Sequence, residues 1–323
     1  MSNLLSWFFP KYISVKSHAT FATLPEFPEF KKLELSDKAD IEKITSKYPP
    51  YSDFNFVSMW SWDIKGDMRI CALNGNLVVR FTDYVTGIPF YSFLGDNEVN
   101  DTAEELIELS KKEGLKPELK LIPEIVATRL DPRFKVAEDR DNFDYIYEIP
   151  ILAELSGNAF QTQRNLINQF TRLYKNLAIK VVNLSEIYHK NNIMLLFNQW
   201  IENKDSCFLV EGCENEFLAL KRLLLIDDYP KFNLTCFEIS VKEKLVGFII
   251  NEKVGEYDIV HFEKADISFK GSYQLLMQKN SKILNQLNIK FLNFEQDLGS
   301  SALRFTKMKF RPVFFLKKYL ITT

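Results

Sequence analysis

Long apolar runs are missing from this chain. No stretch reaches the roughly 18 consecutive apolar residues that a membrane-spanning helix needs, and the most apolar run near the N-terminus, residues 4–9, stops at Pro10. The same N-terminus lacks a basic start, a long apolar centre and a small-residue cleavage site, so it does not match a secretory signal. We therefore expect no transmembrane segment and a cytoplasmic location.

Metal-binding and nucleophile motifs are missing as well. The four cysteines include no C-x-x-C pair, and His18 and His189 have no partner at metal-ligand spacing. The chain contains no G-x-S-x-G elbow, Walker A loop, H-E-x-x-H helix or Rossmann glycine fingerprint. These absences argue against a disulfide framework, a metal site, and hydrolase, NTPase, zinc-protease or dehydrogenase chemistry.

Apolar residues, in contrast, are plentiful. They make up 46% of the 323 residues, and a chain of this length exceeds the usual size of one domain, which predicts two hydrophobic cores. Charge is unevenly spread, because residues 270–323 contain ten Lys or Arg and only two acidic residues. This basic segment is either a local anion-binding face or an ordinary solvated surface.

Two similar series of elements are predicted along the chain. Each half reads as helices, three strands, a helix, a strand, a second helix and a final strand, with a hairpin marked by Asn74-Gly75. The last two strands are expected at residues 290–295 and 313–319. Hairpins followed by helical crossovers give a mixed sheet, so we predict an α/β fold of two tandem GNAT-like domains. The expected division is an arm (1–30), an N-terminal domain (31–155) and a C-terminal domain (156–323).

Candidate catalytic residues cluster at the ends of two predicted strands. His261 and Glu263 are two residues apart, as are Glu295 and Asp297, and residues at this spacing share one face of a strand. The two strand ends should be neighbours, which brings three carboxylates and one imidazole together. Glu263 or Glu295 would then remove a proton from an attacking amine. The alternative is a structural salt-bridge network that contains Glu263, Lys264, Glu295, Arg304 and Lys307.

Two further features are candidates for binding an anion. Gly271 and Ser272 precede a predicted helix, whose N-terminus attracts phosphate, although Tyr273 stands where coenzyme A-binding relatives usually have a second small residue. Arg164 lies beside the apolar stripe of another predicted helix, where its guanidinium would clamp a phosphate or carboxylate. An ordinary turn and a helix-surface ion pair are the structural alternatives.

The residues of the C-terminal half also carry a family resemblance. The segments concerned are Val260 to Asp266, Gly271 to Tyr273, Asn293 to Gly299, Leu303-Arg304 with Lys307, Tyr145 to Tyr147, and Arg164-Asn165. They resemble the phosphatidylglycerol lysyltransferase C-terminal domain family over roughly residues 30–320. The sequence departs from the family at Phe294, where a basic residue is usual, and at Gln163, which replaces one member of a basic pair.

The resemblance implies a tandem GNAT-like fold whose better-studied members move an amino acid from a charged tRNA onto a lipid head group. We therefore expect an acyl- or aminoacyltransferase with acyl-coenzyme A or aminoacyl-tRNA as donor and a small-molecule or lipid head-group acceptor. Implied ligand-binding residues are Lys264, Gly271, Ser272, Tyr273, Arg164, Asn165, Arg304 and Lys307. The competing hypothesis is a binding or regulatory module that kept the fold without chemistry.

Overall fold

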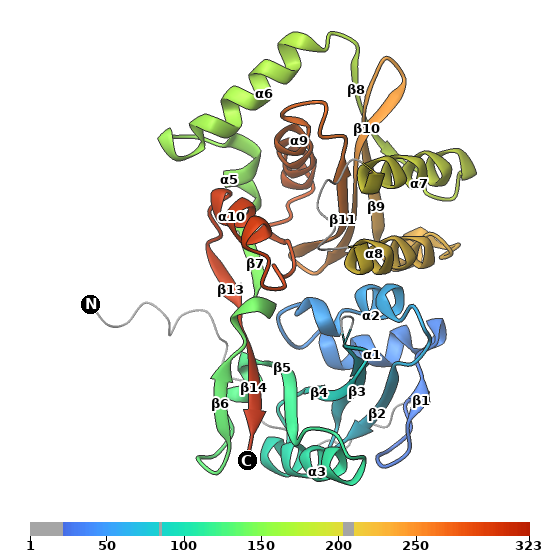
Figure 1. The fold of residues 1–323 in the computed structure, drawn as a ribbon, viewed down its shortest axis with the longest axis vertical. Coiled ribbons are helices and arrows are strands. Elements are labelled where there is room, and N and C mark those ends of the chain that lie inside the picture. Colours follow the sequence, from blue (N-terminus) through green and yellow to red (C-terminus); the bar gives the residue numbers. More distant parts are fainter. Residues whose placement is uncertain (1–21, 84–85, 203–209) are drawn as a thin grey trace.

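The computed structural model describes residues 22–83, 86–202 and 210–323. The arm expected at residues 1–30 lies outside the described residues as far as residue 21. The described chain forms two seven-stranded mixed sheets, one in each half of an elongated molecule, with helices packed on both (Figure 1). The α/β class and the mixed sheets predicted from the sequence are therefore confirmed. No helix in these ranges is long and apolar enough to cross a membrane.

The first sheet has the strand order β1-β2-β3-β4-β5-β14-β6. Its strands are β1 (Lys31–Lys32), β2 (Arg69–Leu73), β3 (Asn76–Thr82), β4 (Pro89–Leu94), β5 (Glu118–Pro123), β14 (Lys318–Thr322) and β6 (Lys135–Glu138). The accompanying helices are η1 (Leu35–Asp37), α1 (Lys38–Thr45), η2 (Ser52–Phe54), α2 (Phe56–Trp62), α3 (Val99–Lys112), α4 (Glu124–Ala127) and η3 (Arg140–Asn142). The predicted hairpin is confirmed, because β2 and β3 pair around Asn74-Gly75, both with positive φ.

The second sheet has the strand order β13-β7-β12-β11-β10-β9-β8. Its strands are β13 (Phe314–Leu316), β7 (Asp144–Glu148), β12 (Phe291–Asn293), β11 (Tyr257–Ala265), β10 (Lys244–Val254), β9 (Leu234–Val241) and β8 (Leu177–Val182). The accompanying helices are α5 (Ile149–Glu154), η4 (Asn158–Phe160), α6 (Gln161–Leu173), α7 (Ile187–Glu202), α8 (Val210–Leu223), η6 (Tyr229–Phe232), α9 (Ser272–Gln286) and α10 (Ser301–Lys309).

The two halves exchange strands. β7 comes from the first half of the chain but pairs with β12 and β13 of the second sheet, whereas the C-terminal β14 pairs with β5 and β6 of the first. The single strand predicted at residues 313–319 is therefore wrong, because this segment divides into β13 and β14, which belong to different sheets. The exchange means that neither sheet is completed by one continuous half of the chain.

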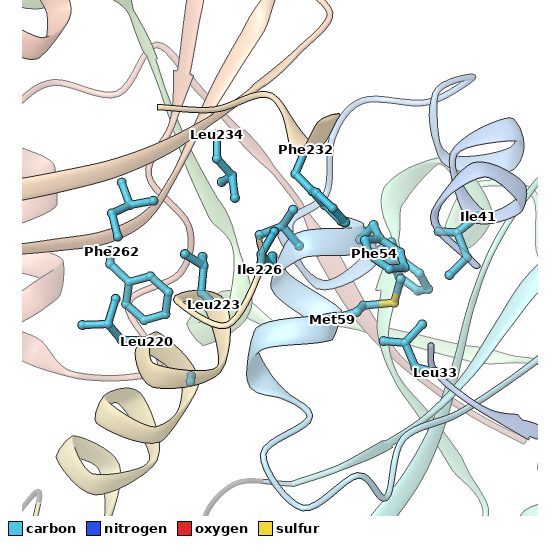
Figure 2. Close-up of a cluster of buried hydrophobic side chains, with 14 of the residues drawn as sticks. Leu33, Ile41, Phe54, Met59, Leu220, Leu223, Ile226, Phe232, Leu234 and Phe262 are labelled. Carbon is cyan, nitrogen blue, oxygen red and sulfur yellow. The ribbon is translucent and has the colours of Figure 1, made fainter. Parts of the chain in front are cut away.

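A shared hydrophobic core lies where the halves meet (Figure 2). Phe54 and Met59 from the first half and Leu220 and Phe262 from the second belong to one buried cluster. The helix α2 begins at an Asn cap, since the Asn55 Oδ1 accepts from the Ser58 backbone N–H at 2.9 Å. The core thus fixes α2 against the second sheet, next to β10 and β11.

Candidate active site

Strand β11 is irregular at the predicted catalytic imidazole. Its register against β10 skips His261, which is therefore an extra residue and forms a β-bulge. A bulge of this kind places consecutive side chains on one face and shifts the alternation that follows. His261 and Phe262 both contact α2, through Ser58 and Trp62 respectively.

The predicted common face of His261 and Glu263 is wrong because of this bulge. Phe262 faces α2 and Lys264 faces α7 and α8, so Glu263, which lies between them, points to the opposite side of the sheet. Burial raises the pKa of Glu263 to about 8, against the opposing charges of Lys264 and Lys307. Among the described residues, the Glu263 Oε1 has no hydrogen-bond partner.

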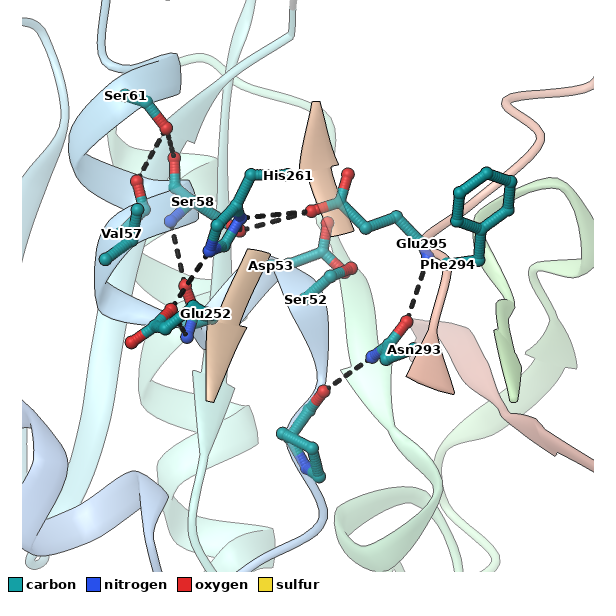
Figure 3. A network of polar contacts seen from close by, with 12 residues as sticks. Ser52, Asp53, Val57, Ser58, Ser61, Glu252, His261, Asn293, Phe294 and Glu295 are labelled. Carbon is teal, nitrogen blue, oxygen red and sulfur yellow. Dashed lines mark hydrogen bonds and ion pairs between the residues drawn. The ribbon is translucent and has the colours of Figure 1, made fainter. Parts of the chain in front are cut away.

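Three polar side chains surround the His261 ring (Figure 3). Its Nε2 lies 3.0 Å from the Glu252 Oε2, and its Nδ1 lies 3.3 Å from the Ser58 Oγ and 3.6 Å from the Glu295 Oε1. The Asn55 Nδ2 donates to the same Glu252 oxygen at 2.7 Å. The His261 and Glu252 side chains are 1% exposed and that of Glu295 is 18% exposed, so Glu295 is the side of this group that faces solvent.

The two carboxylates decide the charge of the ring. Burial is the largest single influence on the pKa of His261 and lowers it, but the hydrogen bonds and charges of Glu252 and Glu295 together raise the pKa to about 9. The imidazole is therefore protonated at neutral pH. A protonated ring has N–H donors at both nitrogens, so it pairs with the two carboxylates and cannot accept a hydrogen bond from the Ser58 hydroxyl.

Glu295 stands where two parallel strands stop pairing. β11 and β12 pair from Tyr257 with Phe291 to Ile259 with Asn293, although β11 continues to Ala265. Beyond this point the Phe294 N–H donates to the Tyr145 carbonyl of β7. The Glu295 N–H donates to the Asn293 Oδ1 at 2.9 Å, and its backbone has a φ of 51°. The expected proximity of the two strand ends is thus found for His261 and Glu295.

The Asp297 carboxylate bonds to residues other than His261. Its carboxylate accepts two hydrogen bonds from Arg304, one from the Tyr145 hydroxyl and one from the Gly299 N–H, and Arg140 lies 3.3 Å away. These bonds hold the pKa of the fully buried Asp297 below its usual value, despite the opposing effect of burial. The predicted meeting of Glu295 and Asp297 around the imidazole is wrong, because Asp297 fastens the loop to α10 and β7 instead.

Gly271, at the predicted anion site at the start of α9, packs against α6. A Cβ on Gly271 would lie 2.7 Å from the Leu166 carbonyl oxygen of α6, and Gly271 has a φ of 95°. The Ser272 hydroxyl donates to the Asp266 carbonyl, and Tyr273 is half-buried, its pKa raised by burial. The glycine is explained by the close approach of α6.

The remaining predicted ligand-binding residues have protein partners or face solvent. Arg164 donates to the carbonyl oxygens of Leu155 and Gly157, so it fastens the turn between α5 and η4, and Asn165 is exposed. The Lys264 Nζ donates to a Glu216 carboxylate oxygen of α8 at 2.5 Å and lies over the Trp200 ring of α7. Both cations thus have structural partners, although these differ from the stated alternatives: Arg164 binds carbonyl oxygens rather than an acid, and Lys264 pairs with Glu216 rather than with Glu263 or Glu295.

Sequence reasoning missed the residues that complete the His261 group. Ser58 in α2 and Asn55, the cap of that helix, lie in the other half of the chain, about 200 positions away, and no spacing marks them. Glu252 carries a weak signal, because Asn251-Glu252 is a buried polar pair at the end of an apolar strand. Such an interruption of a buried strand favours a polar contact in the interior.

Two surface hollows lie in the first half and at its border with α8. One of about 350 Å³ is lined by Lys32, Trp60, Asp63 and Arg222 among others, and one of about 50 Å³ by Trp62, Phe81 and Asn215 among others. Neither is lined by His261 or Glu295. In the parts of the chain that the structure describes, no cluster of His, Cys, Asp and Glu is arranged to hold a metal ion.

Solved structures and one curated protein resemble this chain. A conserved protein of unknown function from Bacteroides thetaiotaomicron is 28% identical, with a TM-score of 0.77, over 90% of this chain and 98% of that one. L-PGS from Bacillus licheniformis is 14% identical, with a TM-score of 0.58, over 93% of each chain, and so shares the fold. An uncharacterized protein from Mycoplasmoides gallisepticum is 24% identical over 179 residues, and the match spans 55% of that protein.

The predicted fold class, a mixed α/β arrangement, agrees with the sheets of this structure and with the fold shared with these solved structures. The strand and helix order of the second half, with three antiparallel strands, a crossover helix and a parallel strand, is the one that brings Glu295 to His261. The model of the family described as phosphatidylglycerol lysyltransferase, C-terminal, matches residues 46–322, and the chain therefore belongs to that family.

Proposed function

We propose that this protein transfers an acyl or aminoacyl group from an activated donor to an amine or hydroxyl acceptor, with Glu295 as general base. The observation that carries the proposal is the position of Glu295. Its carboxylate is 18% exposed, lies 3.6 Å from the buried His261 ring and stands where β11 and β12 stop pairing. Membership of a family described by a phosphatidylglycerol lysyltransferase supports an aminoacyl cargo and a lipid head group as one candidate acceptor.

Acyl transfer to an amine or hydroxyl requires one proton acceptor beside the reacting carbonyl. As the acceptor nitrogen or oxygen bonds to the acyl carbon, its proton passes to the Glu295 carboxylate. The bond from the acyl carbon to the donor sulfur or oxygen then breaks, and the leaving atom keeps the bonding electrons and takes the proton from Glu295. The protonated His261 ring orients that carboxylate, and Glu252 in turn orients the ring. We assign no proton transfer to Glu263, because it points to the opposite side of β11.

The test is transfer by a Glu295→Gln variant. We expect the rate of transfer to fall by about 10² or more, since a positioned general base contributes a factor of this size, while the melting temperature changes little. Glu256→Gln, at a surface ion pair in the β10–β11 turn, is the matched control. Full transfer by Glu295→Gln would reject the assignment of the base.

Thermal-shift measurements and the salt dependence of binding test which donor the protein uses. A donor that binds the folded state raises the melting temperature, so acyl-coenzyme A species and charged tRNA are compared directly. If tRNA is the donor, its affinity falls steeply with salt, because the basic residues 270–323 would displace counterions from the phosphates. Salt-insensitive binding of tRNA would exclude this part of the proposal.

A second candidate function is a binding module without chemistry. It is favoured because the polar groups already bind one another: the Asp297 carboxylate accepts from Arg304 and Tyr145, and the His261 and Glu252 side chains are both 1% exposed. Saturable binding of a donor without turnover, unchanged by Glu295→Gln, would support this candidate against the transferase.

A further inference from the structure

Lys307 lies in α10, against the loop that carries Glu295. Its side chain is buried, and its Nζ donates to the carbonyl oxygens of Phe294 and Gln296, each at 2.5 Å. These carbonyls belong to the residues immediately before and after Glu295. One amine therefore binds the peptide group that precedes Glu295 and the peptide group that follows Gln296, on either side of the proposed base.

Glu295 needs such support because of its backbone. Its φ of 51° lies in the left-handed region, which residues with a Cβ adopt only when neighbouring contacts impose it. The loop is also tied through the Gln296 side chain, which donates to the Ser52 hydroxyl and the Asp53 carboxylate of the first half. The Glu295 carbonyl itself accepts from the Tyr145 N–H of β7 at 3.2 Å, and the two bonds from Lys307 hold the carbonyls of the residues before and after Glu295.

We propose that Lys307 is a positioning residue, whose ammonium fixes the left-handed backbone of Glu295 and thereby aims its carboxylate at His261 and the acceptor. The inference rests on the proposed function for its catalytic meaning but not for its structural part. It replaces the expectation that Lys307 binds an anionic ligand, because both carbonyl contacts direct the amine into the protein.

The charge of Lys307 gives this arrangement a pH dependence. The titratable groups that face it come from β7, β11 and the loop itself: Asp144, Tyr145, Glu263, Glu295 and Asp297. Burial, the largest influence, lowers the pKa of Lys307 to about 8 although the carboxylates raise it. Above this pH the amine is neutral and its bonds to the carbonyls are weaker, since charge-assisted hydrogen bonds are about twice as strong as neutral ones.

Hydrogen exchange tests the structural part without any substrate. The Phe294, Glu295 and Leu298 amides are bonded to protein acceptors and report on the loop. In the wild-type protein, protection of these amides, corrected for intrinsic exchange, should fall as pH rises from 7 to 9. In Lys307→Met it should fall about tenfold at pH 7, because local opening becomes easier, and Lys307→Arg should retain most of it. The control is Lys309→Met, at an exposed position of the same helix.

Transfer assays then separate this inference from the proposed function. Lys307→Met should lower kcat about 10- to 100-fold with a small change in KM, because a base displaced by about 1 Å loses a factor of this size. Lys307→Arg should restore activity and move the alkaline limb of the pH profile above 8. If amide protection in the loop depends on Lys307 but the protein shows no transfer activity, only the proposed transferase function is rejected, and the positioning role of Lys307 remains. Unchanged loop protection in Lys307→Met, or unchanged kcat in the same variant, would overturn the role of Lys307.

Discussion

The Nε2 of His261 and the Oε2 of Glu252 lie 3.0 Å apart on neighbouring strands, and both side chains are 1% exposed. The contact exists because the bulge in β11 turns His261 toward α2, on the side where Glu252 meets Asn55. A buried imidazole held this way is protonated at neutral pH and fixes the Glu295 carboxylate on its other side.

Glu252→Gln should lower stability in a pH-dependent way. The pKa of His261 is raised from 6.5 to about 9 in the folded protein, so its contribution is fully present below pH 6.5 and is lost as pH rises through 9. The full shift corresponds to about 3 kcal/mol and Glu295 supplies part of it, so removing Glu252 should cost a share of this amount at pH 6 and much less at pH 9.5. Urea unfolding at the two pH values measures this, with the surface variant Glu256→Gln as control. An equal cost at both pH values would show that the ring is not charged by Glu252.

Local patterns in the sequence predicted much of this architecture but less of the site. The Asn74-Gly75 hairpin and the order of strands around α9 follow from turn chemistry and hydrophobic periodicity, which act over a few residues. The proximity of His261 and Glu295 followed from that order. The opposite orientation of Glu263 did not, because one extra residue in β11 shifts the alternation of the strand and has no sequence signature.

Contacts between distant segments were beyond the reach of these patterns. Ser58 reaches His261 across 203 positions, and only the shared core between α2 and the second sheet brings them together. The break between β13 and β14 is also non-local, since it depends on which sheet offers each segment a free edge. Periodicity alone therefore read residues 313–319 as one strand.

Lys318→Met should be strongly destabilising, whereas Lys317→Met should not. Lys318 is fully buried, pairs with Asp53 and lies 2.8 Å from the Asp144 Oδ1, so its removal leaves two buried acids unpaired. We expect a cost of about 3–5 kcal/mol, the range found when a buried pair loses one partner. The Lys317–Glu138 pair is exposed and should contribute at most about 1 kcal/mol. Chemical unfolding at pH 7 compares the free energies of unfolding of the two variants. Equal losses would contradict the importance of the buried contacts of Lys318 with Asp53 and Asp144.

Asp297→Asn should weaken the contact between the loop and α10. It should also reduce the loss of stability that occurs as pH falls into the acid range. The pKa of Asp297 is below 3.8 in the folded protein, so its contribution is present above pH 3.8 and is lost as pH falls through the lower folded value. We expect a loss of about 2 kcal/mol at pH 7, less than for a fully buried pair, because Arg304 remains partly solvated. Asp141→Asn, at the exposed partner of the same arginine, is the control. A larger loss in the control would place the main tie at Asp141.

Gly271→Ala should destabilise the protein more than Gly255→Ala. Both glycines have positive φ, which costs an alanine about 1–2 kcal/mol at either position. At Gly255 a Cβ meets nothing within 4 Å, whereas at Gly271 it would lie 2.7 Å from the Leu166 carbonyl oxygen, so α6 and α9 must move apart. Thermal unfolding in the absence of any ligand should therefore show the larger drop for Gly271→Ala. Equal drops would mean that the contact with α6 does not explain this glycine, and the phosphate-binding interpretation of Gly271 and Ser272 would regain its support.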